Sequence, residues 1–205
     1  MKNRLEISDL SLAYGKRTIL EHISFTLAAG EAVALCGENG SGKTTLLTAA
    51  AGILRPTHGK IRRNGKVGYV PQSAALLEDM TFADNLRYFS AIARARVPQV
   101  LPLCADELRR MRVRDMSGGM KKLCSIVCTL VAAPDILLLD EPYAALDEAH
   151  AAMLTDYLGD FLQSGGSLLI AAHDADEYLP LASRRMLLAD GSMREETLTQ
   201  AETPV

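Results

Sequence analysis

The sequence predicts an α/β fold in which a mostly parallel sheet is joined by an N-terminal antiparallel β subdomain and a small helical subdomain. Largely apolar runs at residues 32–35, 136–139 and 167–172 are typical of strands buried inside a parallel sheet. Residues 4–14 and 18–27 alternate loosely between apolar and polar side chains, which favours half-exposed antiparallel strands.

The composition indicates a single globular domain. The chain has 205 residues, of which 48% are hydrophobic, and its net charge is −3. This length suits one domain over residues 1–205 with a substantial core. The weak negative charge argues against broad nucleic-acid affinity, so we expect no nucleic-acid partner. The apolar run Leu123–Ala133, which has no charge and no proline, is too short to cross a bilayer, and we expect a cytosolic protein.

The two N-terminal strands are separated by a turn that starts at Tyr14. An adenine ring could stack on this aromatic side chain. Considered by itself, Tyr14 is more simply interpreted as a residue at the edge of a strand.

The run at 32–35 leads directly into a glycine-rich turn and a helix. Residues Gly37–Thr44 fit the phosphate-loop pattern of two glycines followed by Lys and Thr. Gly40 and Gly42 permit positive φ and a close approach of the backbone to a ligand. Successive N–H groups and the helix N-terminus then favour an anion. Lys43 offers a cation for the β- and γ-phosphates, and Thr44 offers a hydroxyl for Mg²⁺.

We expect the phosphate-loop helix to end near Gly52. Ile61 and Val67–Val70 then predict short strands around a turn at Asn64-Gly65. Gln72 follows the second of these strands, where an α/β protein commonly binds its ligand. In isolation Gln72 would be an ordinary loop residue.

Residues 78–116 predict a small helical insertion. Thr81, followed three residues later by Asp84, marks a helix start. Basic residues accumulate towards the end of the insertion and just beyond it: Arg109, Arg110, Arg112, Arg114, Lys121 and Lys122. Such a run usually forms a solvated face, and we expect that here in preference to a phosphate or lipid-headgroup site.

Ser117-Gly118-Gly119 precedes a strongly helical pattern. A serine at a helix start beside two glycines is a small anion-binding site, although alone it would be only a cap. The next strand ends in Asp140-Glu141. Two acids at the tip of a buried strand are costly unless a cation or water chemistry uses them. Asp140 can orient Mg²⁺, and Glu141 can polarise a water molecule.

Asp147 starts the next predicted helix, and His173 follows the strand at 167–172. Because His173 ends its strand as Asp140-Glu141 ends the preceding one, it can face the same crevice. A lone histidine more often has no such role. Residues 184–189 and a turn at Asp190-Gly191 complete the sheet.

Taken in this order, the motifs resemble the ATP-binding subunit of ABC transporters over nearly the whole chain. The corresponding motifs are the phosphate loop at 37–44, Gln72 as the Q-loop glutamine, Ser117-Gly118-Gly119 as the signature, Ile136–Glu141 as the Walker B strand, Ala145-Leu146-Asp147 as the D-loop, His173 as the switch histidine and Tyr14 as the adenine-stacking aromatic. Met120 stands where the signature usually has Gln, and Leu123 where many members carry Arg. The Met-Lys-Lys run is more like that of exporter-type subunits.

The resemblance implies a P-loop NTPase core with a helical subdomain near residues 73–133. It implies that ATP is bound by Tyr14, Gly37, Glu38, Asn39, Gly40, Ser41, Gly42, Lys43, Thr44 and Thr45. It implies that Glu141, His173 and Gln72 are catalytic, and that Thr44, Gln72 and Asp140 bind Mg²⁺. Two ATP-binding subunits, in a homodimer or heterodimer, would then pair head to tail. The signature residues of each would act on the ATP of the other, and Asp147 would lie in the D-loop.

We therefore expect an ATPase that powers transport by closing on ATP, with a separate integral membrane permease as its partner and a position on the inner face of the cell membrane. One alternative is a soluble ABC-type ATPase in cofactor assembly, DNA repair or translation. Such proteins often have tandem domains, coiled coils or zinc modules, and none of these is evident here. A nucleotide-binding regulator without turnover is a third possibility, but the presence of Asp140, Glu141 and His173 argues against it.

Overall fold

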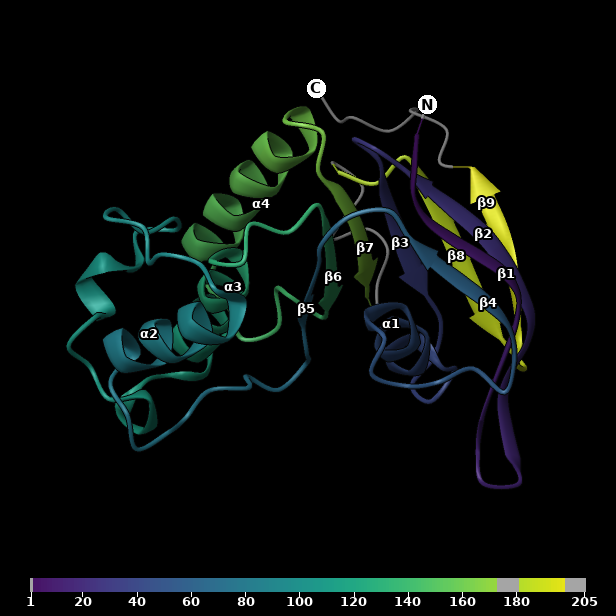
Figure 1. Ribbon diagram of the computed structural model, residues 1–205, viewed down its shortest axis with the longest axis horizontal. Coiled ribbons are helices and arrows are strands. Elements are labelled where there is room, and N and C mark those ends of the chain that lie inside the picture. Colours follow the sequence, from purple (N-terminus) through teal and green to yellow (C-terminus); the bar gives the residue numbers. More distant parts are fainter. Residues whose placement is uncertain (1, 173–180, 198–205) are drawn as a thin grey trace.

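A computed structural model describes residues 2–172 and 181–197 (Figure 1). Its helices and strands, in chain order, are β1 (Asn3–Tyr14), β2 (Arg17–Ala28), β3 (Ala32–Cys36), α1 (Lys43–Ala51), β4 (His58–Arg63), β5 (Val67–Val70), α2 (Phe82–Ala93), α3 (Gly118–Leu130), β6 (Ile136–Asp140), α4 (Glu148–Gln163), β7 (Ser167–Ala171), β8 (Arg184–Ala189) and β9 (Ser192–Thr197). Two short 3₁₀ helices, Ala105–Leu108 and Val113–Asp115, lie between α2 and α3.

The larger sheet has the strand order β5-β6-β7-β3-β8-β9. Its strands run parallel except for β9, which pairs antiparallel with β8. Every residue of β3, β6 and β7 is buried, as expected for apolar strands covered on both faces. The prediction of a mostly parallel sheet is therefore confirmed.

The smaller sheet has the order β2-β1-β4 and is antiparallel throughout, which confirms the predicted N-terminal β subdomain. Figure 1 shows α1 between this sheet and the larger one. Alternate residues of β1 and β2 form a common core with α1 and with one face of the larger sheet. Because α1 is held from two sides, the phosphate loop at its N-terminus has a rigid support.

The two short strands predicted around the turn at Asn64-Gly65 are present as β4 and β5, but they belong to different sheets. β4 pairs with β1 in the smaller sheet, whereas β5 pairs with β6 in the larger one. Parallel pairing with β6, together with the hydrogen bond from the Lys66 backbone N–H to Asp135 Oδ2 at 2.8 Å, draws the chain across to the second sheet.

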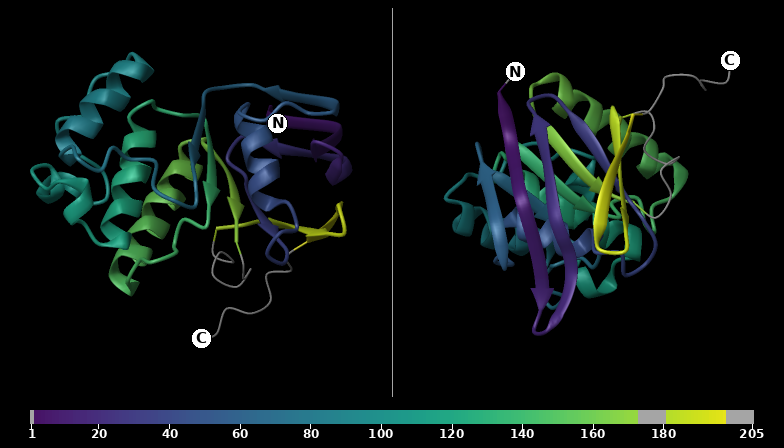
Figure 2. Two further views of the ribbon diagram at one scale, coloured as in Figure 1. Left: turned by 90° about the horizontal axis from the view of Figure 1, so that it is seen from below. Right: turned by 90° about the vertical axis from the view of Figure 1, so that its right-hand side faces the viewer.

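The helical region lies at the far end of the larger sheet from the smaller one, as the two further views in Figure 2 also show. The predicted helix starts are confirmed, since the side chains of Thr81 and Ser117 accept hydrogen bonds from the backbone N–H groups of Asp84 and Met120. Helices α2, α3 and α4 share one apolar core with the opposite face of the sheet. None of the helices in the described residues has both the length and the apolar character needed to cross a membrane.

Candidate nucleotide site

The phosphate loop connects the buried strand β3 to α1. Gly40 and Gly42 have φ values of 83° and 105°, so the positive φ expected at both glycines is present. The loop packs tightly against β8: a Cβ placed on Gly37 would lie 2.4 Å from the carbonyl oxygen of Leu188. Lys43 Nζ curls back to donate to the carbonyl oxygens of Gly37 and Glu38, at 2.6 and 3.1 Å. The Lys43 ammonium is therefore folded against the backbone of the phosphate loop.

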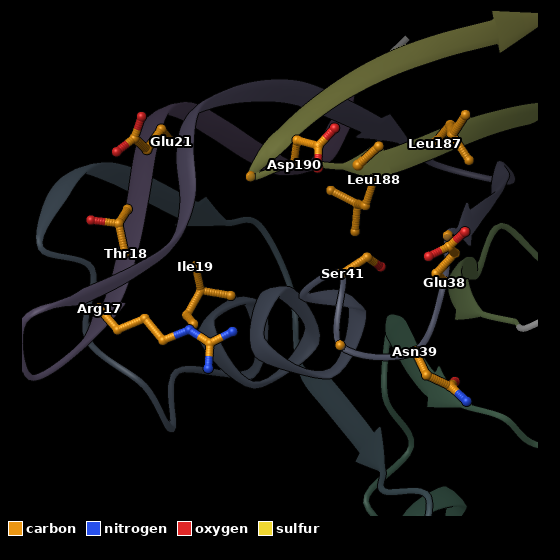
Figure 3. Close-up of a pocket in the computed structure, with 14 residues that line it drawn as sticks. Arg17, Thr18, Ile19, Glu21, Glu38, Asn39, Ser41, Leu187, Leu188 and Asp190 are labelled. Atoms are coloured by element: carbon orange, nitrogen blue, oxygen red, sulfur yellow. The ribbon is translucent and has the colours of Figure 1, made fainter.

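A cavity of about 690 Å³ lies over this loop. Figure 3 shows Arg17, Thr18 and Ile19 on its β2 side, with Leu187, Leu188 and Asp190 on the side of the β8–β9 turn. Ser41 lines the cavity, and its Oγ is buried without a hydrogen-bond partner. A buried hydroxyl without a partner, in the loop that also carries Lys43, fits a polyanionic ligand such as a nucleoside triphosphate.

The β1–β2 turn beside the cavity brings Tyr14 and Arg17 to the same part of the molecule. Tyr14 is 55% exposed at the end of β1, so its ring is open to a stacking partner. Arg17 and Ile19 were not among the site residues predicted from the sequence. Their position three to five residues after Tyr14 was the available signal, because β2 runs antiparallel to β1 and directly follows the turn.

The end of β6 brings the two acidic residues beside the phosphate loop. Asp140 is the last residue of β6 and only 1% exposed. Thr44 Oγ1 donates to Asp140 Oδ2 at 2.8 Å, which joins the first turn of α1 to the tip of β6. Burial raises the pKa of the Asp140 carboxyl, while the hydrogen bond from Thr44 opposes that shift. A divalent cation at this position would stabilise the charged carboxylate.

Gln72 and Glu141 meet directly. Because β5 and β6 are adjacent and parallel, the residues that follow them emerge at the same edge of the sheet. Gln72 Nε2 donates to Glu141 Oε2 at 2.8 Å. Glu141 has a φ of 47°, a left-handed conformation that is strained for a residue with a side chain and is common at functional sites.

Lys122 is a residue that the sequence analysis misjudged. It belongs to the basic run expected on a solvated face, yet its side chain is buried, with 4% exposure. Its ammonium donates to the carbonyl oxygens of Pro71, Gln72 and Asp140. The prediction was wrong because α3 is covered by the sheet on the side where Lys122 lies. Lys121, on the exposed side, pairs with Glu78 at 2.9 Å.

The signature residues pack against the loop that follows Glu141. A Cβ placed on Gly119 would lie 2.6 Å from the carbonyl oxygen of Ala145, and one on Gly118 would lie 3.4 Å from Ala145 Cβ. Asp147 caps α4 by accepting from the backbone N–H of His150 at 2.9 Å. His173, predicted to face the same crevice, lies outside the described residues.

The structure thus brings Lys43, Thr44, Asp140, Glu141 and Gln72 together around one end of the sheet. No group of three or more His, Cys, Asp or Glu side chains within 2–172 and 181–197 could hold a metal ion. A hard cation at Thr44 and Asp140 would therefore take most of its oxygens from phosphates and water, as Mg²⁺ commonly does.

Comparison with known proteins agrees with this site. Residues 20–144 match the family model described as ABC transporter. The chain is 34% identical over 207 residues to a Nod factor export ATP-binding protein of Paraburkholderia xenovorans, covering 91% of this chain and 68% of that protein. It is equally identical to a ribose import ATP-binding protein of Rhizobium etli, where the match covers 91% of this chain and 42% of the relative.

Solved structures share the fold. The structure of an ATP-binding subunit of an ABC transporter is 27% identical and superposes with a TM-score of 0.84, covering 95% of this chain and 90% of that one. A dimeric ATP-binding cassette described as a post-hydrolysis state bound to ADP and Pi is 20% identical with a TM-score of 0.80, covering 95% and 99%. The phosphate loop, the acid-tipped strand β6 and the family match together establish that the chain belongs to the ABC transporter family, as an ATP-binding ATPase subunit.

Proposed function

We propose that this subunit hydrolyses Mg²⁺-ATP with Glu141 as the residue that polarises the attacking water. The hydrogen bond from Gln72 to Glu141, next to the bond from Thr44 to Asp140, is the observation that carries the proposal. These bonds hold the carboxylate of Glu141, which can orient or deprotonate water, next to the carboxylate of Asp140, which can orient the cation. As a member of its family, the subunit powers an ATP-driven membrane transporter.

The residues around the loop suit a bound triphosphate. Lys43 holds two loop carbonyls, and a β- or γ-phosphate is a stronger partner for its ammonium. Ser41 Oγ gains the partner that it lacks. We propose Tyr14, Gly37, Glu38, Asn39, Gly40, Ser41, Gly42, Lys43, Thr44 and Thr45 as the ATP-binding residues. Bound Mg²⁺ supplies charge neutralisation on the phosphates, and Thr44, Gln72 and Asp140 are its proposed protein ligands.

The residues of the hydrolytic site have distinct proposed roles. Glu141 accepts a hydrogen bond from Gln72 and thereby keeps a fixed orientation. Its carboxylate can accept a proton from water as the oxygen attacks phosphorus. Gln72 joins the water site to the cation site. His173 is proposed to contact the γ-phosphate.

We further propose that two subunits pair head to tail, so that Ser117, Gly118 and Gly119 of each act on the ATP of the other. The start of α3 presents backbone N–H groups and the positive end of a helix dipole. The dimeric cassette bound to ADP and Pi supports dimer formation in this fold. Asp147, in the proposed D-loop, would lie near the same interface.

The proposed unit is the single ATP-binding domain of residues 1–205, with residues 73–133 as its helical subdomain. Its partners are an integral membrane permease and a second ATP-binding subunit, identical or related. It would lie in the cytoplasm, on the inner face of the cell membrane. The named relatives include one export and one import subunit, so the proposal concerns the energising role that both directions share.

Nucleotide titration of Lys43→Ala tests the site, with Lys60→Ala as a matched control. Lys60 is exposed on β4, outside the cavity. Removing the only lysine of the phosphate loop should abolish tight ATP binding, whereas Lys60→Ala should bind as the wild type does. Equal ATP affinity in the Lys43 and Lys60 variants would contradict the proposed site. Co-purification of an integral membrane protein with the tagged chain tests the transporter role.

A further inference from the structure

Lys122 lies at the junction of three elements and has no role in the function proposed above. It belongs to the second turn of α3, the helix that Ser117 caps. Its ammonium lies under the ends of β5 and β6, the two strands that deliver Gln72 and Glu141. A charged lysine in such a place is expensive to bury, so its retention calls for an explanation.

The contacts of Lys122 satisfy its ammonium completely. Nζ donates to Gln72 O at 2.6 Å, to Pro71 O at 3.2 Å and to Asp140 O at 3.4 Å. These three acceptors equal the three N–H bonds of an ammonium group. All are backbone carbonyls, so Lys122 fixes main-chain positions and leaves the side chains of Gln72, Asp140 and Glu141 free for the nucleotide.

Burial lowers the pKa of Lys122, and the nearby negative charges of Asp140 and Glu141 oppose that shift. The two carboxylates thus help to keep the lysine charged. In return, a positive charge beneath them reduces the repulsion between two acids that are adjacent in sequence.

Resting on the function proposed above, we propose that Lys122 is a positioning residue for ATP hydrolysis. It binds the backbone that carries Gln72 to the backbone that carries Asp140 and Glu141, and it ties both to the signature helix α3. Contact at Ser117–Gly119 with a second subunit would then be transmitted through α3 to the hydrolytic pair. Lys122 orients the backbone that carries Gln72 and Glu141, whereas the phosphate loop holds the nucleotide.

The neighbouring Lys121 provides a matched control on the same helix. Its ammonium pairs with Glu78 on the surface, and this ion pair has no contact with Gln72 or Asp140. Lys121→Met and Lys122→Met therefore remove the same charge and the same donors from adjacent positions. A difference in kcat between the two variants therefore measures the effect of the contacts that Lys122 makes with the ends of β5 and β6.

The experiment measures steady-state ATP hydrolysis and equilibrium ATP binding of the full chain and its variants. For Lys122→Met we expect kcat to fall by on the order of tenfold to a hundredfold, because an ångström-scale displacement of catalytic groups has an effect of that size. KM and ATP affinity should stay close to those of the wild type, and Lys121→Met should behave as the wild type. Lys122→Arg keeps the positive charge but places its N–H donors in a planar arrangement. Its kcat should therefore lie between the kcat of Lys122→Met and that of the wild type.

A double variant distinguishes positioning from general destabilisation. If Lys122 acts by holding Gln72, the kcat losses of Lys122→Met and Gln72→Ala will not multiply in the double variant. Fully multiplicative losses, or equal kcat values for the two lysine variants, would overturn the inference. If Lys122→Met fails to fold, Lys122→Arg decides: a lowered kcat at unchanged KM supports the inference, and a wild-type kcat refutes it. The proposed function is tested separately by Glu141→Gln: if this variant hydrolyses ATP at the wild-type rate, the proposed function fails, whatever the result for Lys122.

Discussion

Substituting Gly37 by alanine should impair the enzyme through a collision that can be located in the structure. Gly37 has a φ of 148°, and its added Cβ would lie 2.4 Å from Leu188 O and 2.6 Å from Ser41 Oγ. Neither neighbour can yield easily, because one is strand backbone and the other is part of the loop. To reach ordinary contact distance, the loop and β8 must separate by about 1 Å, which costs roughly a hundredfold in rate when catalytic groups move.

Gly165→Ala is the matched control for this collision. Gly165 also has a positive φ, 89°, but a Cβ there would meet nothing within 4 Å. Both substitutions carry a backbone strain of about 1–2 kcal/mol, so both should lower the melting temperature. Only Gly37→Ala should lower kcat/KM for ATP by about a hundredfold. A Gly37→Ala protein that hydrolyses ATP as efficiently as Gly165→Ala would refute the reasoning.

Three further predictions concern the nucleotide and the acidic strand end. Glu141→Gln should bind ATP normally and hydrolyse it at least about a hundredfold more slowly, and wild-type turnover would exclude Glu141 as the water-polarising residue. Because burial raises the pKa of Asp140, the folded state binds that proton more tightly than the unfolded chain, and stability falls as pH rises through this pKa. Asp140→Asn removes this cost, so thermal melting at pH 7 without nucleotide should occur at a higher temperature, while Mg²⁺-dependent turnover is lost; a lower melting temperature would contradict the assignment. Tyr14→Ala should weaken ATP and ADP binding alike in equilibrium titrations, because adenine is common to both, and a loss confined to ATP would indicate a phosphate effect.

The sequence was informative wherever local chemistry decides the structure. The buried strands β3, β6 and β7 follow from short apolar runs, and the starts of α2 and α3 follow from the caps Thr81 and Ser117. The phosphate loop was equally predictable, since few residue types suit a turn that cradles phosphates.

Features that depend on distant partners were not predictable in the same way. The turn at Asn64-Gly65 has hairpin composition, yet pairing of β5 with β6 carries the chain to the other sheet. Lysine is a residue type that usually lies on the surface, and the burial of Lys122 is explained only by the three carbonyl groups that it contacts in other segments. Arg17 lines the nucleotide cavity because β2 folds back beside the phosphate loop, and its place just after the turn at Tyr14 was the only sequence signal for this.

Light scattering of the Glu141→Gln protein, with and without Mg²⁺-ATP, tests the central claim most directly. That claim is that ATP is held between the phosphate loop of one subunit and Ser117–Gly119 of another. ATP should convert the protein from monomer to dimer. Ser117→Arg in the same background should stay monomeric while binding ATP nearly as before, because its bulk displaces the backbone donors at the start of α3. A Glu141→Gln protein that stays monomeric at saturating ATP, alone and when mixed with a related ATP-binding subunit, would contradict the account.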